Sequence, residues 1–307
     1  MKNANNSCSA GSLAELHQTY CDEGLHFRNL SSRTIKWWRN TFRYFRKRTN
    51  ANRLEDLTAD VFRGFFLDGA IECKWSPDTR HSYYRCLHSF LNWCAKRKYL
   101  ETNPLAEIDK PKLGKKLPKS ISEDEARLVL ETILNMRYSY RYEKYRNYAF
   151  IATLVFTGLR LSEALNLGTG DVDLQNDIVS VRHGKGNKER IVPIPLKLKS
   201  GLQRYLEERN RLKRECARFF TSLRDRPLTA SGAGKIIKRL KRKTKIDFSA
   251  HKLRHTFATL LLQAGCDLFT LSELMGHSDI KTTAIYLSTT VARKKEQIMK
   301  HPLNGIF

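Results

Sequence analysis

Acidic residues are scarce in this sequence of 307 residues, which has 31 Asp and Glu against 56 Lys and Arg, for a formal net charge of +25. A surplus of this size indicates a polyanionic partner, with nucleic acid as the first candidate and an anionic membrane surface as the second. The longest apolar runs, residues 151–156 and 257–262, are far too short to span a bilayer. Because the first residues also lack the apolar stretch of a signal peptide, we expect a cytoplasmic protein.

The sequence also lacks cysteines at the spacing of known cysteine motifs. The seven cysteines are scattered, and no two of them form a C-x-x-C pair. This pattern argues against a disulfide framework and against a cysteine-rich zinc site, and it indicates reduced thiols. Hydrophobic residues make up 41% of the chain, enough for packed cores, and the length suits two domains.

A stretch rich in Pro, Gly and Lys divides the chain. Residues 106–120 contain five lysines together with Pro111, Gly114 and Pro118, which disfavour regular helices. An extended basic linker explains this composition, and a merely solvated loop is the alternative. We therefore expect one domain at 1–105, a linker at 106–120 and a second domain at 121–307.

The first domain shows the periodicity of a helical bundle. Apolar side chains recur at three- and four-residue steps from Leu13 and again from Ile35, and residues 54–66 and 83–100 repeat the pattern. We assign the aromatic residues of these segments to the core rather than to base stacking: Trp37, Trp38, Tyr83, Tyr84 and Trp93. A group of basic residues near one helix end is suited to phosphate contacts: Arg39, Arg43, Arg46, Lys47 and Arg48.

The second domain is expected to mix helices with a small sheet. Ser122 and Glu125 form a capping box that opens a helix, and a second helix spans about 143–156. Alternating segments at 178–182 and 189–195, separated by a loop with two glycines, predict a β-hairpin, with 171–174 as a third strand. Residues 196–300 are predicted to be helical again. The fold class is thus mainly α with a small antiparallel β-sheet (α+β).

Three clusters in this domain carry chemically useful side chains. In the first, at 157–167, Arg160 lies where a helix begins after Gly158, although a simple ion pair with Glu163 would also explain it. In the second, at 251–262, His251, Arg254 and His255 share one helical face, unless they are structural histidines beside a surface arginine. The third, at 271–288, places His277 in a turn and Tyr286 near a helix end.

A zinc site is the metal-dependent interpretation of these histidines. His251 and His255 lie four residues apart on a helix, and His277 would be a third ligand. However, position 252 is Lys, where a zinc protease motif needs Glu, and Arg254 on the same face would repel a cation. We therefore expect no metal and no other cofactor.

Taken together, the clusters supply each group that metal-free cleavage of a phosphodiester needs. Two guanidinium groups can hold the non-bridging oxygens with permanent charge. A phenol can attack phosphorus to give a covalent ester, and a lysine or imidazole can protonate the leaving oxygen.

The same segments, TGLRLSE, HGKGNKER, HKLRHTFAT and LMGHSDIKTTAIY, resemble the tyrosine recombinase (phage integrase) family, closest to its Xer-like and transposon members, from about residue 10 to 290. The resemblance implies a helical core-binding (SAM-like) domain followed by a catalytic domain. It implies phosphate-binding roles for Arg160 and Arg254, an acid/base role for His251, a phosphate contact for His277 and the nucleophile role for Tyr286. Lys185 matches the general acid, with Lys188 as its competitor, and His255 counts as supporting.

The resemblance implies a site-specific recombinase that cuts and rejoins double-stranded DNA through a 3′-phosphotyrosine, acting as a homo-oligomer, in the synaptic complex a tetramer. A type IB topoisomerase, a non-catalytic DNA-binding regulator and the metal-dependent nuclease are the alternatives. The C-terminal segment 291–307 ends in apolar residues that must dock. We favour exchange of this tail between protomers over docking on its own domain.

Overall fold

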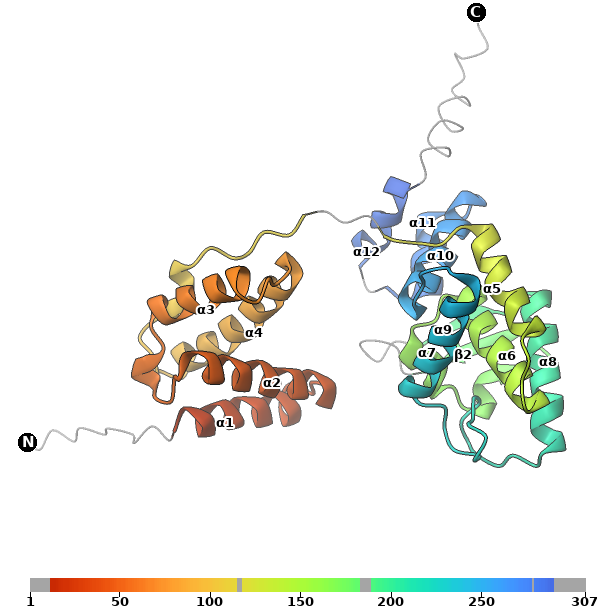
Figure 1. Cartoon of the computed structure of the whole chain (residues 1–307), viewed down its shortest axis with the longest axis horizontal. Coiled ribbons are helices and arrows are strands. Elements are labelled where there is room, and N and C mark those ends of the chain that lie inside the picture. Colours follow the sequence, from red (N-terminus) through yellow and green to blue (C-terminus); the bar gives the residue numbers. More distant parts are fainter. Residues whose placement is uncertain (1–11, 115–117, 183–188, 278, 290–307) are drawn as a thin grey trace, which may run out of the picture. The chain divides into compact units, whose positions relative to one another are not determined.

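The chain folds into two compact units that divide at residues 115–116. The structure, a computed structural model, describes residues 12–114, 118–182, 189–277 and 279–289 (Figure 1). Each unit has its own buried apolar cluster. Within the described ranges, no helix combines the length and the apolar character needed to cross a membrane.

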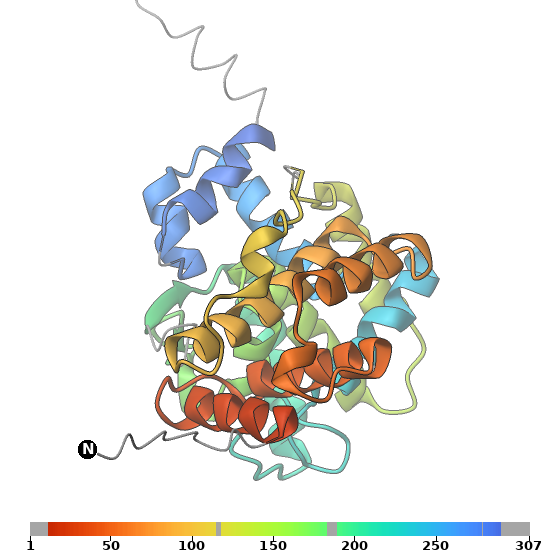
Figure 2. The same ribbon diagram turned by 90° about the vertical axis from the view of Figure 1, so that its left-hand side faces the viewer.

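The described part of the N-terminal unit is a bundle of four α-helices. Its elements are α1 (Leu13–His26), α2 (Ser32–Thr49), η1 (Leu54–Asp56), α3 (Ala59–Ile71), α4 (Pro77–Lys96) and η2 (Pro104–Glu107). Each α-helix begins after a Ser or Thr whose hydroxyl accepts a backbone N–H of the first turn, which satisfies a donor that the helix itself leaves open. Helices α1 and α2, drawn in red, lie side by side in both views (Figures 1 and 2).

Two predicted helices have different bounds. The continuous helix expected at 54–66 is wrong, because Leu57 leaves helical geometry and Thr58 caps a new helix. The Asp56 carboxylate also accepts the backbone N–H groups of Asn52 and Arg53, which stabilises a separate turn. The helix expected at 83–100 begins earlier, at Pro77, since Ser76 caps it and proline suits a first helical position.

Most of the aromatic residues assigned to the core are found there. Trp38 and Tyr84 are buried, and Tyr83 and Trp93 pack partly buried against the same cluster. Trp37 is the exception, with 39% of its surface exposed, because it lies beside Trp38 on α2 and so points away from the core.

The first residues of the expected linker pack against the N-terminal unit. Leu105 in η2 is fully buried, and the Tyr84 hydroxyl donates to the carbonyls of Leu105 and Ile108 over 3.1 and 3.2 Å. The helical bundle therefore extends past residue 105.

The C-terminal unit is larger and contains the sheet. Its elements are α5 (Glu123–Asn135), α6 (Arg141–Thr157), α7 (Leu161–Asn166), η3 (Thr169–Asp171), β1 (Val172–Asp173), β2 (Ile178–Val181), β3 (Arg190–Pro193), α8 (Leu196–Arg211), α9 (Ala230–Thr244), α10 (Ala250–Gln263), α11 (Leu268–Met275), α12 (Lys281–Ala284) and η4 (Ile285–Thr289). The strands pair antiparallel in the order β1-β2-β3. The predicted fold class, mainly α with a small antiparallel sheet, is confirmed.

Helix α6 is the centre of this unit. It is buried on nearly all sides and contacts α5, α8 and α10. Gly201 lets α8 approach closely, because a Cβ there would lie 2.5 Å from a ring carbon of Tyr148. The predicted capping box of α5 is confirmed, since Ser122 and Glu125 each accept the other's backbone N–H.

The segment predicted as helical at 196–300 is interrupted. Helix α8 ends at Arg211, and the chain between α8 and α9 is irregular. The buried Arg209 guanidinium donates to the carbonyls of Arg218 and Phe219 over 2.7 and 2.6 Å. These hydrogen bonds satisfy backbone acceptors that a helix would otherwise pair, and helical periodicity does not reveal them.

The last helices form a small subcluster. Helix α10 leads from the body of the unit to α11, α12 and η4, all drawn in blue (Figures 1 and 2). Phe257, Leu262, Leu271, Met275 and Tyr286 are the larger members of its buried cluster. This packing brings residues about 30 positions apart in sequence next to one another.

Candidate active site

Five of the six predicted site residues line one cleft of about 1130 Å³ in the C-terminal unit: Arg160, His251, Arg254, His277 and Tyr286. They come from α7, α10, the turn after α11 and η4. The sixth, Lys185, and its competitor Lys188 lie at 183–188, outside the described residues.

Helix α10 carries the histidines and the arginine of the second sequence cluster, His251, Arg254 and His255. Ser249 caps it by accepting the backbone N–H of Lys252. Arg254 is only 4% exposed, so the alternative of a surface arginine is wrong. Its helical neighbours Leu253 and Phe257 are buried in the cores on either side.

Arg254 is held rigidly by backbone carbonyls. Its guanidinium donates to the carbonyl oxygens of Gly158 and Met275, each over 2.6 Å, and contacts His277 Nε2 at 3.0 Å. Burial, and then the nearby Arg160, lowers the pKa of Arg254 to about 10, so the side chain stays charged at neutral pH. Gly158 has φ +60°, and a Cβ there would lie 2.3 Å from the Phe257 ring, so only glycine fits this turn.

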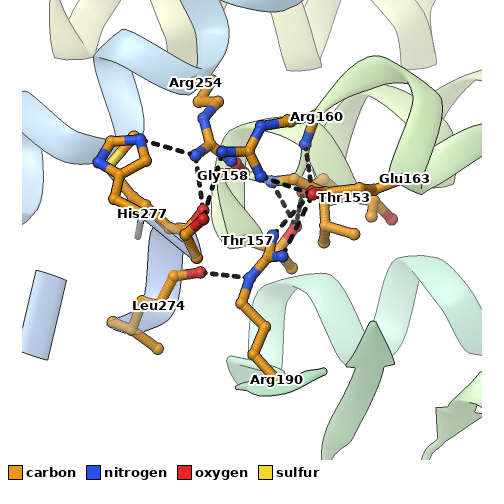
Figure 3. A network of polar contacts seen from close by, with 12 residues as sticks. Thr153, Thr157, Gly158, Arg160, Glu163, Arg190, Arg254, Leu274 and His277 are labelled. Atoms are coloured by element: carbon orange, nitrogen blue, oxygen red, sulfur yellow. Dashed lines mark hydrogen bonds and ion pairs between the residues drawn. The ribbon is translucent and has the colours of Figure 1, made fainter. Parts of the chain in front are cut away.

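Arg160 is both paired and available to a ligand. As the N-cap residue of α7 it contacts Glu163, Nη1 to Oε1, at 2.7 Å, as the ion-pair alternative predicted (Figure 3). Its side chain nevertheless keeps 26% of its surface exposed and lines the cleft. The ion pair therefore orients the guanidinium without withdrawing it from the cleft.

The buried Glu163 carboxylate also binds a residue that sequence reasoning missed. Arg190 on β3 reaches it at 2.7 Å and donates from Nε to the carbonyl of Leu274 at 2.8 Å (Figure 3). Burial alone would raise the pKa of Glu163, but hydrogen bonds from Arg190 and from the backbone of Arg160 lower it to about 2. Arg190 thus connects the hairpin to α7 and to the turn that carries His277.

The contacts of His277 define its protonation. Arg254 has only donors, so His277 Nε2 accepts from it, and Nδ1 carries the ring proton and donates to Thr283 Oγ1 at 2.8 Å. Burial, and then Arg254 and Arg160, lowers the pKa of His277 to about 4. The imidazole is therefore neutral at pH 7, beside the two arginines.

Tyr286 is almost fully buried, and its hydroxyl has a histidine partner. The Tyr286 oxygen lies 2.7 Å from His255 Nδ1, and the two rings are 5.4 Å apart. Burial raises the pKa of Tyr286. The ring of His251, exposed at the start of α10, lies 4.2 Å from that of His255. His255, which the sequence placed among supporting residues, thus touches the predicted nucleophile.

Helix α9 adds two lysines to the cleft. Lys238 and Lys241 line it together with Ile237 of the same basic segment, while Ile236 and Leu240 are buried in the core. Across the part of the chain that the structure describes, no three His, Cys, Asp or Glu side chains are grouped so as to hold a metal ion. The arrangement favours binding of an anion beside a buried phenol.

The chain is similar to proteins of one known family. Residues 119–293 match the phage integrase family. The chain is 33% identical to the tyrosine recombinase XerD of Listeria innocua over 289 residues, covering 90% of this chain and 95% of the relative. It is 34% identical to the tyrosine recombinase XerC of Bacillus licheniformis over 254 residues, 80% of this chain and 82% of the relative.

Solved structures show the same fold. A XerH site-specific recombinase bound to a palindromic difH substrate in a post-cleavage complex aligns with a TM-score of 0.74 and 25% identity, covering 92% of this chain and 83% of that chain. Motifs, fold and relatives all lead to one assignment: the chain belongs to the phage integrase family, as a Xer-like tyrosine recombinase that breaks and rejoins DNA in site-specific recombination.

Proposed function

We propose that Tyr286 is the nucleophile that attacks a DNA phosphate bound between Arg160 and Arg254. One observation carries the proposal: a buried phenol shares a cationic cleft with two arginines that are fixed by Glu163 and by backbone carbonyls. Fixed guanidinium groups stabilise the charge that develops on the non-bridging oxygens without having to reorganise. His277, neutral and bonded to Arg254, supports the phosphate from the adjacent turn.

The reaction then has two matched steps. In the first step, Tyr286 attacks the phosphate, forms a 3′-phosphotyrosine and releases a 5′-hydroxyl. In the second step, the 5′-hydroxyl of the partner strand attacks the phosphotyrosine, which joins the two strands and frees the tyrosine. The phosphodiester bond energy is kept in the ester, so neither ATP nor a metal ion is required. Lys185 protonates the departing 5′-oxygen in this scheme, with Lys188 as the alternative donor, and His251 acts as an acid or base at the cleft entrance.

The relatives support recombination over the other functions. XerD and XerC are named tyrosine recombinases, and the XerH structure was solved on DNA after cleavage. A regulator without catalysis would have no need for a fixed arginine pair beside a buried tyrosine. We place the protein in the cytoplasm, where its DNA substrate would be found.

We further propose that the active assembly is a tetramer on two paired sites, linked by exchange of the tail 291–307. The C-terminal unit offers an acceptor of suitable character: a cleft of about 340 Å³ between α5 and α6, with an apolar floor that includes Leu130, Leu134 and Phe156. The charged residues that line it are of both signs, Glu123 and Glu131 with Arg127 and Lys197, so the proposal rests on the apolar residues of the cleft rather than on its charge.

The nucleophile is tested with nicked suicide duplexes made from DNA that flanks the gene. Tyr286→Phe removes only the hydroxyl, so DNA binding should persist while SDS-resistant protein–DNA adducts disappear. Wild-type adducts should form equally in EDTA, and Arg254→Ala should slow them by on the order of 100-fold. Adducts from the Phe variant would reject Tyr286, and loss of wild-type adducts on chelation would restore the zinc interpretation.

A further inference from the structure

The contact between His255 and Tyr286 joins two segments that are 31 residues apart in sequence. His255 Nδ1 lies 2.7 Å from the phenolic oxygen, within the range of a direct hydrogen bond. Tyr286 is 2% exposed, so bulk water has little access to its hydroxyl. A buried phenol that attacks phosphorus must lose its proton to a neighbouring group rather than to solvent.

The surroundings of His255 decide what it can do. From its own helix, α10, it faces His251 and Arg254, and Tyr286 faces it from η4. The other titratable or charged residues that line the same cleft are Arg160, Lys238, Lys241 and His277. Burial, and after it His251 and Arg254, lowers the pKa of His255, so the imidazole is neutral and one ring nitrogen can accept a proton.

We propose that His255 is the general base of strand cleavage, taking the phenol proton of Tyr286 on Nδ1 as the phenolic oxygen attacks phosphorus. The proposal rests on the proposed function of Tyr286 as nucleophile. It adds a catalytic residue, because His255 touches the reacting oxygen directly.

Each proton that moves during strand cleavage has a donor and an acceptor. The O–H bond of Tyr286 breaks, its proton moves to Nδ1, and the oxygen forms the bond to phosphorus. The bond from phosphorus to the 5′-oxygen breaks, and that oxygen takes a proton from the general acid. In rejoining, the incoming 5′-hydroxyl gives up its proton to that acid, and the departing phenolate recovers its own from Nδ1.

Bound DNA improves His255 as a base. Without DNA, burial and then His251 and Arg254 lower the pKa of His255 to about 4. A phosphodiester between Arg160 and Arg254 brings negative charge next to these cations, which raises the pKa of His255 toward the working pH. The base therefore becomes effective when the substrate is in place.

The experiment compares His255→Asn with wild type in single-turnover cleavage of a nicked duplex. Asparagine keeps a hydrogen-bonding atom near the position of Nδ1 but does not take up a proton at these pH values. At pH 7 we expect a loss of about 100-fold or more, the usual contribution of general base catalysis. The difference in cleavage rate between wild type and His255→Asn should shrink about tenfold per pH unit toward pH 9.5, because hydroxide then forms the phenolate of Tyr286 directly. His255→Gln provides a second variant, and the exposed His26→Asn should match wild type.

A sulfur-substituted duplex separates the base from the acid. A 5′-bridging phosphorothiolate has a thiolate leaving group that departs without a proton. Cleavage by Lys185→Ala or Lys188→Ala should be restored on it, depending on which lysine is the acid, whereas His255→Asn should stay slow. If the histidine variants cleave within threefold of wild type, cleave faster, or are restored by sulfur, His255 is not the base. Adducts from Tyr286→Phe would instead reject the nucleophile itself.

Discussion

Single residues in this protein act through partners that the fold brings to them. Glu163 shows this most clearly, because its buried carboxylate binds Arg160 from its own helix and Arg190 from a strand. Without the carboxylate, Arg160 would lose the partner that orients it toward the cleft, and Arg190 would no longer connect β3 to α7. The acid is therefore part of the site even though it would repel the substrate in direct contact.

Glu163 should make the stability of the protein depend on pH in acid. Its pKa is lowered from 4.5 to about 2, so its contribution to folding is complete above pH 4.5 and is lost as pH falls through about 2. The shift corresponds to roughly 3 kcal/mol. We expect the difference in unfolding free energy between wild type and Glu163→Gln to shrink from pH 6 to pH 2 in denaturant titrations. The exposed Glu207→Gln should differ little from wild type throughout, and a constant Glu163→Gln difference would contradict the assignment.

At the scale of elements, the turn between α6 and α7 determines how the arginines meet. Gly158 ends α6 in a left-handed conformation, packs against Phe257 and offers its carbonyl to Arg254. Arg160, two residues on, is the N-cap residue of the next helix, α7. One glycine therefore positions both of the proposed phosphate-binding residues.

Gly158→Ala should damage stability and cleavage together. The added methyl group meets the Phe257 ring and the backbone φ is unfavourable for alanine, so we expect a loss of about 2 kcal/mol or more in unfolding free energy. Gly170→Ala is the matched control, because a Cβ there meets nothing within 4 Å. Equal melting temperatures for the two variants would show that the turn tolerates a side chain.

Local patterns predicted much of this arrangement, and the exceptions share a cause. Periodicity and capping residues predicted α5, the hairpin strands and the shared face of His251 and Arg254. Arg190 and the role of His255 were missed because each depends on a contact between distant segments, 27 and 31 residues apart. The irregular chain after α8 was also missed, because the nearby side chain of Arg209 and the distant carbonyl of Leu167 bind its backbone.

For the whole molecule, the excess of positive charge and the apolar C-terminal residues both need a partner. The net charge of +25 agrees with the DNA that a recombinase of this family cuts and rejoins. The tail 291–307 lies outside the described residues, so its docking remains the proposal made above. Exchange of the tail between protomers would couple placement of Tyr286 to assembly, because the tail follows it closely in sequence.

Deleting residues 301–307 should separate assembly from folding. We expect a folded variant that binds single DNA sites normally but loses cooperative binding to paired sites and recombines poorly. Gel shifts on single and paired sites, with melting temperatures, measure this. Replacing Leu130 with Glu in the proposed acceptor cleft should give the same defect in a full-length protein. A truncated chain that unfolds yet still pairs sites would place the tail on its own domain.

The central claim, that Tyr286 carries the covalent link to DNA, is tested most directly by locating that link. The wild-type adduct on a nicked duplex is digested with trypsin and nuclease, and the modified peptide is sequenced by mass spectrometry. The account predicts a nucleotide attached to the tyrosine of the peptide TTAIYLSTTVAR, residues 282–293. A nucleotide on any other residue would contradict it.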